Sequence, residues 1–264
     1  METRPLGRSG LRVSPVGLGT VKIGRNTGVK YPQPFDLPSD AEVVALLETA
    51  RELGVNLIDT APAYGTSEAR LGALLPGDRD EWVIGTKAGE EFVDGASRFD
   101  FSPAAIRASV ERSRRRLRVD TLDFVLLHSD GADLRRLDED RALEPLLELR
   151  EAGVVREVGV STKTVEGGLR ALELGAGVVM VTLNPQHQDE LPVIEAARRA
   201  GAGVLIKKAL GSGHLAGASG ADAALRFALG TPGVSSVIVG TLNPAHLRAN
   251  VNTAERSSSA GDAD

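Results

Sequence analysis

Short apolar runs alternate with longer amphipathic segments along most of the chain. The runs are rich in Val, Ile and Leu and are bounded by Gly, Pro, Asp or Ser, which is typical of buried β-strands. The pattern predicts strands at 13–20, 55–60, 82–87, 121–128, 154–161, 177–184, 203–210 and 234–240. Apolar residues recur at helical spacing between several of these runs, which predicts helices at 39–54, 102–118, 190–201 and 243–255.

The repeated order of strand and helix favours a parallel (β/α)8 TIM barrel. We expect a single domain over residues 1–255, opened by a short N-terminal β-hairpin in the run RPLGRSGLRV, and a disordered tail over 256–264. The structural rival is a doubly wound open sheet. No GxGxxG opens a helix after the first strand, which disfavours that sheet. The segment 22–38 is expected to be a long polar loop on the active face of the barrel.

Composition narrows the classes of function. With 264 residues, of which 42% are hydrophobic, the chain can bury one large core. Its net charge of -5, with mixed charge along the helices, gives no sign of nucleic-acid or membrane-surface binding. Cysteine is absent, which excludes disulfides and thiolate chemistry, and the opening METRPLGRSG lacks the apolar region of a signal peptide. No apolar run reaches membrane-spanning length, so we expect a soluble cytoplasmic protein.

Four polar residues follow predicted strands directly or lie in the next turn. Asp59 follows the run NLI, Lys87 follows WVIGT, His128 follows DFVLL, and Tyr64 lies in the turn DTAPAY. In a parallel barrel these strand ends meet at the C-terminal face, where barrel active sites are built. Taken singly, the aspartate could start a loop, and the tyrosine and histidine could be packing residues. Together the four indicate an active site.

The four side chains are suited to protonating the alkoxide that forms when a carbonyl group is reduced. A free phenol titrates near ~10 and is a poor acid at pH 7, but a nearby cation lowers its pKa. Lys87 supplies that cation, and Asp59 holds it in place by an ion pair. His128 can hydrogen-bond and orient the substrate carbonyl, while Tyr64 protonates the developing alkoxide. This chemistry needs a hydride, which a chain without a metal cluster must take from a cofactor.

The motifs DTAPAYG, TK and LLHSD, in this order, resemble those of the aldo-keto reductase family, and so does the opening RPLGRSGLRVSPVGLGT. The resemblance extends from about residue 4 to about residue 255. It implies a barrel with an N-terminal hairpin, a reduced nicotinamide cofactor, and reversible reduction of aldehydes or ketones with Tyr64 as proton donor. A small-molecule carbonyl substrate, an open cleft of broad specificity and a monomeric state are the corresponding expectations.

The resemblance also implies a cofactor site. Gly19 and Thr20 match the end of the family's first strand near the nicotinamide, and Ser161 and Thr162 match the carboxamide-binding pair, in which the second residue is usually Asn. Met180 aligns where the family often has Gln, and Lys207 where it often has a Tyr that stacks on the nicotinamide. The run ALGSG, 209–213, resembles the loop around the pyrophosphate, with the adjoining cofactor candidates Lys208, Leu210 and Gly211.

The segment VIVGTLNPAHLRAN resembles the family's adenosine-phosphate segment, and the matching residues are Gly240, Thr241, His246 and Asn250. Many NADPH-preferring members have an Arg where His246 aligns, and that Arg holds the 2'-phosphate. We expect NADPH as the cofactor, with NADH as the alternative, because histidine is neutral for much of the time at pH 7.

Two other functions stay open at this level. A strand-end lysine such as Lys87 can form a Schiff base, as in barrel lyases that cleave carbon–carbon bonds. A nucleotide-binding barrel protein with little turnover is the second alternative. Further candidates for the substrate pocket are Lys22, Tyr31, Trp82 and Phe92.

Overall fold

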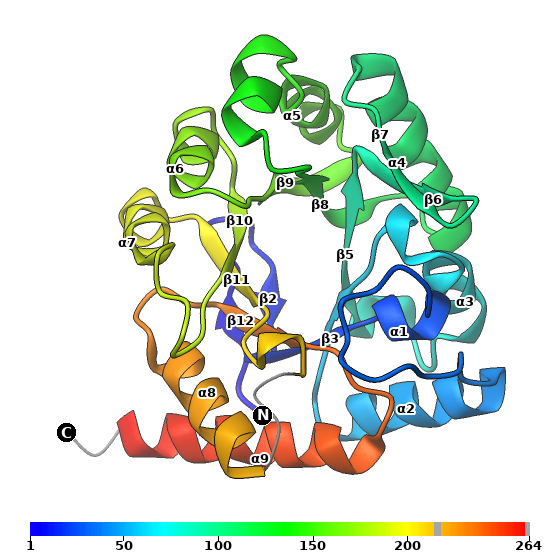
Figure 1. Ribbon diagram of the computed structural model, residues 1–264, viewed down its shortest axis with the longest axis vertical. Helices are drawn as coiled ribbons and strands as arrows, with labels where there is room; N and C mark the ends of the chain where they lie inside the picture. The colour runs from blue at the N-terminus through cyan, green and yellow to red at the C-terminus, as the bar shows by residue number, and fades with distance from the viewer. Residues whose placement is uncertain (214–217, 262–264) are drawn as a thin grey trace.

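The computed structural model describes residues 1–213 and 218–261, and over these ranges eight parallel strands close into a barrel (Figure 1). In chain order the strands are β3 (Val16–Gly19), β4 (Leu57–Asp59), β5 (Val83–Ala88), β8 (Leu122–His128), β9 (Val155–Ser161), β10 (Val178–Thr182), β11 (Gly203–Lys207) and β12 (Ser236–Val239). Strand β12 pairs with β3, which closes the ring. The TIM barrel expected from the sequence is confirmed.

Helices surround the strands and cover the outside of the barrel (Figure 1). They are α2 (Asp40–Glu52), α3 (Ser67–Leu74), α4 (Pro103–Leu117), α5 (Glu144–Glu151), α6 (Val165–Glu173), α7 (Leu191–Ala200), α8 (Ala218–Gly230) and α9 (Pro244–Gly261). A short helix, α1 (Val21–Gly24), follows β3 at the C-terminal end of the barrel. Short 3-10 helical turns occur at Pro62–Tyr64, Arg79–Glu81 and Gly211–Gly213, and a π-helical turn occurs at Arg135–Glu139.

Local sequence signals account for several helix ends. Ser39 and Glu42 form a reciprocal capping box at the start of α2, and the Ser102 side chain accepts a hydrogen bond at the start of α4. Helix α7 ends at Gly201, which adopts the left-handed conformation with φ of 71°. These ends agree with the helices expected at 39–54, 102–118 and 190–201.

The apolar side chains form two clusters, one on each side of the strands. The outer cluster packs the strands against the helices. The inner cluster fills the barrel and includes Phe124, Met180 and Leu205. The N-terminal hairpin, β1 (Arg4–Pro5) with β2 (Arg12–Val13), contributes buried residues such as Leu6 to this inner cluster. The hairpin was expected from the sequence, and it closes the N-terminal end of the barrel, so the opposite end is the one that stays open.

Several elements differ from the sequence expectation, among them the short helix α1, which lies partly within the segment 22–38 that was expected to be a loop. The first expected strand, 13–20, is divided, because Val13 pairs in the hairpin and only β3 enters the barrel. A second hairpin, β6 (Glu90–Val93) with β7 (Ala96–Phe99), was not expected. Helix α9 continues to Gly261, so residues 256–261 are helical rather than disordered, because no Pro or Gly interrupts the helix before that point. Residues 262–264 of the expected tail lie outside the described residues.

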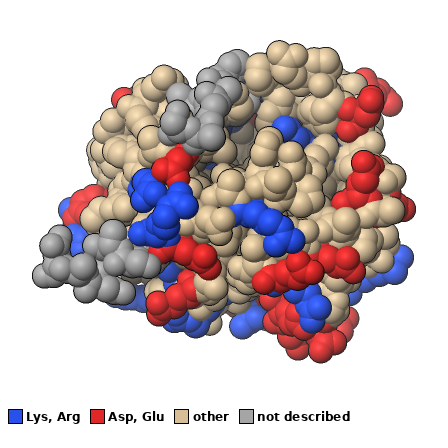
Figure 2. Space-filling view, turned by 90° about the horizontal axis from the view of Figure 1, so that it is seen from below, with Lys and Arg blue, Asp and Glu red and all other residues tan. Residues whose placement is uncertain are grey.

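The outer surface carries basic and acidic side chains close together, as Figure 2 shows for the face below the barrel in Figure 1. Ion pairs on the outer helices include Arg226 with Asp222 on α8, and Arg248 on α9 with Glu52 on α2. This mixed surface agrees with the mixed charge along the helices in the sequence. No described helix has the length and apolar character needed to span a membrane.

Candidate active site

A cavity of about 520 Å³ opens at the C-terminal ends of the barrel strands, and it is lined by all four residues singled out in the sequence. Lys22 and Tyr31, two of the further pocket candidates, also line it. Trp82 does not, because it precedes β5 at the opposite end of that strand and is buried there. Phe92 does not line it either, and its ring lies 3.4 Å from the guanidinium of Arg25.

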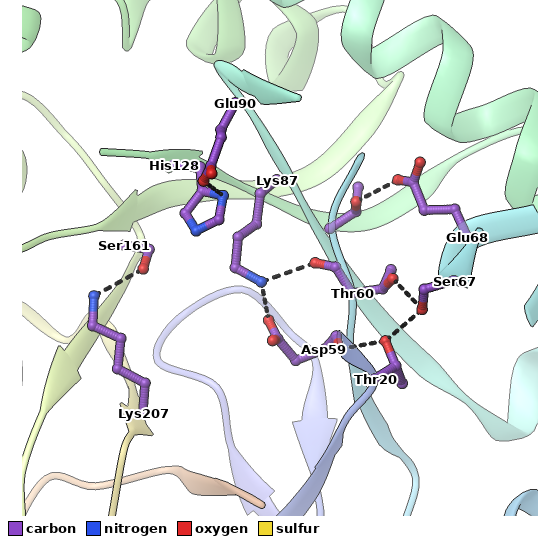
Figure 3. Close-up of polar contacts among 11 residues, drawn as sticks. Thr20, Asp59, Thr60, Ser67, Glu68, Lys87, Glu90, His128, Ser161 and Lys207 are labelled. Carbon is purple, nitrogen blue, oxygen red and sulfur yellow. Dashed lines mark hydrogen bonds and ion pairs between the residues drawn. The ribbon is translucent and has the colours of Figure 1, made fainter. Parts of the chain in front are cut away.

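Lys87 is buried at the centre of a polar network (Figure 3). Its Nζ donates to Oδ1 of Asp59 at 2.6 Å and to the carbonyl oxygen of Thr60 at 2.8 Å. Burial acts to lower the pKa of Lys87, but Asp59 and the Tyr64 phenol outweigh it, so the pKa is raised. The amine therefore stays protonated and provides a fixed positive charge in the cavity.

A chain of hydroxyl groups holds the backbone around Asp59 (Figure 3). The Thr20 hydroxyl donates to the carbonyl oxygen of Asp59 at 2.9 Å, and Ser67 donates to that same hydroxyl at 2.8 Å. The Thr60 and Ser67 hydroxyls lie 3.0 Å apart. Thr20 was expected to contact the nicotinamide. It lines the cavity, but its hydroxyl is engaged in joining the ends of β3 and β4.

Tyr64 ends the helical turn Pro62–Tyr64, which follows β4. Two glycines shape this turn. Gly65 adopts φ of 62°, and a Cβ at Gly24 would lie 2.3 Å from the carbonyl oxygen of Tyr64, so neither position accommodates a side chain without strain. The Tyr64 ring centroid lies 4.7 Å from the Lys87 ammonium and 6.3 Å from the ring centroid of His128.

The pKa of Tyr64 differs in direction from the sequence expectation. Burial raises the pKa of the phenol, and this effect outweighs the lowering by the Lys87 charge. The sequence expectation rested on the cation alone, whereas the loss of water around the hydroxyl has the larger effect. The arrangement thus holds Tyr64 in its protonated form, ready to give up a proton only to a strongly basic oxygen.

His128 has a partner that was not expected from the sequence, Glu90. Its Nδ1 lies 2.8 Å from Oε2 of Glu90, on the β6–β7 hairpin, although the direction is not that of a good hydrogen bond (Figure 3). Burial lowers the pKa of His128, while Glu90 acts to raise it. Burial also raises the pKa of Glu90, but contacts with His128, Ser97 and Arg25 bring it down to about 2. The histidine is therefore neutral beside an ionised carboxylate.

Lys207 occupies the other side of the cavity, at the end of β11 (Figure 3). Its Nζ donates to Oγ of Ser161 at 3.0 Å and to the carbonyl oxygen of Thr162. Ser161 and Thr162, the expected carboxamide-binding pair, are thus in contact with the residue that replaces the expected tyrosine. Burial is the main cause that lowers the pKa of Lys207 to about 8.

The remaining cofactor candidates fall into two groups. Those that line the cavity are Gly19, Thr20, Ser161, Thr162, Lys208, Leu210 and Gly240. Gly211 lines an adjoining cavity of about 590 Å³. Thr241, His246 and Asn250 line neither cavity. The Thr241 hydroxyl accepts from the backbone N–H of Asn243 before α9, His246 is exposed on the first turn of α9, and Asn250 is mostly buried on that helix.

The chain contains six lysines, Lys22, Lys30, Lys87, Lys163, Lys207 and Lys208, and every one of them lines the cavity that holds Tyr64 and His128. Within the described residues no arginine lines it, and Asp59 is its one carboxylate. The cavity is therefore strongly positive, although the whole chain carries a net charge of -5. Such a cavity fits a polyanionic ligand, as a dinucleotide cofactor is. The described residues contain no cluster of side chains that could hold a metal ion.

Comparisons with known proteins agree with this geometry. A family model described as the aldo/keto reductase family matches residues 15–223. A solved structure from Pseudomonas aeruginosa that carries the aldo-keto reductase designation is 50% identical and superposes with a TM-score of 0.88, over 97% of this chain and 95% of that chain.

Two curated proteins are more distant relatives. The oxidoreductase YqkF of Bacillus subtilis, named as uncharacterized, is 27% identical over 96% of this chain and 91% of that protein. The D-threo-aldose 1-dehydrogenase of a Pseudomonas species is 34% identical over 66% of this chain, and the match spans 57% of that protein.

Proposed function

This chain belongs to the aldo/keto reductase family of oxidoreductases, and from that premise we propose that it reduces aldehydes or ketones to alcohols with a nicotinamide cofactor. The observation that carries the proposal is the cavity in which Tyr64, Lys87, Asp59 and His128 meet. A phenol beside a fixed ammonium is suited to protonating an alkoxide, which is the base that carbonyl reduction generates.

NADPH is the proposed cofactor, with NADH as the alternative, and when bound it supplies the hydride. Lysines around the cavity would hold the phosphate groups, and Ser161 and Thr162 would hold the carboxamide, provided that Lys207 releases them. The exposed His246 is proposed to lie toward the adenosine end. Because this side chain is exposed, we expect it to bind a 2'-phosphate only weakly, so both NADPH and NADH need testing.

Tyr64 is the proposed proton donor. Its pKa is high in the buried site, so it keeps its proton until an alkoxide forms at the substrate. Lys87 then stabilises the phenolate by its charge, and Asp59 keeps that charge in position. Each of the three residues thus has one task in a single proton transfer.

His128 is proposed to orient the reacting oxygen. A proton on Nδ1, beside the ionised Glu90, leaves Nε2 available to the cavity. In the neutral ring Nε2 accepts a hydrogen bond, which suits the hydroxyl of an alcohol. In the protonated ring it donates, which suits a carbonyl oxygen. Glu90 is therefore proposed to determine whether His128 binds the alcohol hydroxyl or the carbonyl oxygen of the substrate.

The Schiff-base reaction at Lys87 has less support. An imine forms from a neutral amine, whereas the ion pair with Asp59 raises the pKa of Lys87 and keeps it charged. A barrel protein with nucleotide binding but little turnover remains the alternative to a working reductase.

The test follows oxidation of NADPH and of NADH by absorbance with a reactive aromatic aldehyde, and the reverse reaction with aldoses, because one relative is named for that activity. We expect Tyr64→Phe to lower turnover by at least about 100-fold. The other tyrosine of the chain provides a matched control. Tyr31 also lines the cavity, but the ring that lies against the Lys87 ammonium and the His128 ring is that of Tyr64, so Tyr31→Phe should keep most of the turnover. Absence of turnover and of cofactor binding in the wild type would refute the proposal.

A further inference from the structure

Lys207 combines features that hydride transfer does not require. We propose that its Nζ amine is a covalent binding site for carbonyl compounds, which condenses with a negatively charged aldehyde to form an imine. The proposal does not rest on reductase activity, because the amine would capture its ligand whether or not a cofactor is reduced.

The hydrogen bonds of Nζ suit a neutral amine. It donates to two neutral oxygens, Oγ of Ser161 and the carbonyl oxygen of Thr162. A neutral amine has two N–H groups and one lone pair, so these two bonds use both hydrogens and leave the lone pair unused. Because Lys207 lines the cavity and is partly exposed to it, a carbonyl carbon there can be attacked by that lone pair.

The surroundings of Lys207 contrast with those of Lys87. No carboxylate among the described residues lies within ion-pair distance of the Lys207 Nζ, whereas Asp59 lies 2.6 Å from that of Lys87. An unpaired ammonium in a partly buried position is disfavoured, and losing the proton relieves the cost.

Charges on four neighbouring elements act on Lys207. Burial has the largest effect and lowers its pKa to about 8. Lys208 on the following residue and Lys87 on β5 also lower the pKa, while Glu190 beyond β10 and Asp133 beyond β8 raise it. At pH 7 a pKa of about 8 leaves roughly one amine in ten neutral, against roughly one in 3,000 for a lysine at its ordinary value.

The proposed reaction is a balanced condensation. The amine nitrogen adds to the carbonyl carbon and forms a C–N bond. The carbonyl oxygen then leaves as water with the two hydrogens that the nitrogen gives up, so that R–CHO and Lys–NH2 yield R–CH=N–Lys and H2O. No oxidant or reductant takes part, and hydrolysis reverses the reaction.

The charge of the cavity selects the ligand. Lys30 and Lys208 line the same cavity, and the one carboxylate among its described lining residues, Asp59, is already paired with Lys87. An aldehyde that carries a carboxylate or phosphate is therefore attracted to the site, and a neutral aldehyde of the same shape is not.

The experiment is reductive trapping at pH 7 without nicotinamide cofactor. Wild-type protein is treated with 4-carboxybenzaldehyde and cyanoborohydride, and peptide mass spectrometry locates the adduct. We expect labelling of Lys207 at least about tenfold faster than that of any other lysine, in line with its larger neutral fraction. The methyl ester of the same aldehyde should react more slowly at Lys207, and labelling should accelerate as the pH rises towards about 8.

Two variants separate a specific site from general lysine reactivity. Lys207→Arg keeps the positive charge but forms no stable imine, so it should lose the fast adduct. Lys163→Arg keeps the charge of another cavity lysine and should retain the fast adduct. Labelling spread evenly over the lysines, or concentrated on Lys87, would overturn the proposal. Equal rates for the acid and its ester would overturn the charge selection.

A measurement on the wild type covers the case in which Lys207→Arg fails to fold. NMR titration of the lysine side-chain signals should show one of the six titrating near pH 8. If all six titrate at their ordinary values near ~10, no amine in the cavity is poised for the reaction and the proposal fails.

Discussion

The two sides of the barrel opening each present a lysine at a strand end, yet the two lysines differ in their partners. Lys87, on β5, is paired with Asp59 and its pKa is raised. Lys207, on β11, contacts only neutral oxygens and its pKa is lowered to about 8. The same residue type is thus a permanent charge on one side and a titrating amine on the other. The partner, rather than the position at a strand end, decides which chemistry a lysine supports.

The largest expected effect comes from breaking the ion pair between Lys87 and Asp59. Lys87→Met leaves the buried carboxylate of Asp59 without its cation, which should lower the free energy of unfolding by about 3–5 kcal/mol. Urea denaturation measures the loss. The double variant Lys87→Met with Asp59→Asn removes the unpaired charge and should recover part of it. A loss below about 1 kcal/mol in the single variant would mean that the pair is not buried as described.

The same substitution on the other side should have a smaller effect. Lys207→Met removes a partly buried charge that has no carboxylate partner and whose pKa is lowered to about 8, so the free energy of unfolding at pH 7 should not fall, because the relief of that charge offsets the two lost hydrogen bonds. Urea denaturation of both variants under one set of conditions compares their free energies of unfolding directly. Equal losses in the two variants would contradict the difference between the two sides.

The two lysines should also respond to pH in opposite directions. Stability due to the raised pKa of Lys87 is present below its unfolded value and is lost as the pH rises through the folded pKa. For Lys207 the folded pKa is the lower one, so the unfolded chain binds more protons between about pH 8 and pH 10.5, and stability rises across that range. Thermal melts of wild type and Lys207→Met from pH 7 to pH 10 test this, and the rise should be absent from the variant.

A more local effect is expected at His128, which lies between the two sides. Glu90→Gln removes the carboxylate that raises the pKa of His128 against the effect of burial, so the pKa should fall further. NMR of the imidazole nitrogens would give the titration midpoint and the tautomer. Glu91→Gln, next to it on β6 and paired with Arg112, is the matched control and should leave the midpoint unchanged. A midpoint that rises in Glu90→Gln would contradict the assigned contact.

The smallest effect is expected outside the cavity. Arg248→Gln breaks an exposed pair with Glu52 and should change the free energy of unfolding by no more than about 0.5 kcal/mol. Urea denaturation measures it beside the Lys87 variant. A larger change would show that the contact between α9 and α2 depends on this pair.

The barrel could be predicted because its signals are local and repeat. Each strand is a short apolar run, and Asp59, Lys87 and His128 follow such runs directly, so their meeting at one end of a parallel barrel follows from topology. The pairing of Lys207 with Ser161 could not be predicted in this way. The two residues lie on strands separated by β10, and their contact depends on side-chain length and direction across the barrel.

The β6–β7 hairpin, which was not expected, has a recognisable turn signal in the sequence. Asp94 and Gly95 lie between β6 and β7 with φ of 53° and 79°, and Asp-Gly between strand-forming residues is a strong sign of a two-residue turn. Recognising it would have placed Glu90 next to the end of β5. The contact with His128 would still have needed the structure, because it joins a hairpin outside the barrel to a strand within it.

Because all six lysines line one cavity, titration of the whole protein at alkaline pH reports on that cavity. Arginine stays charged in proteins at all ordinary pH values, and the chain has no cysteine. The two tyrosines of the chain, Tyr31 and Tyr64, line the same cavity as the six lysines. Side-chain protons that the native protein releases above about pH 8 therefore come from the cavity.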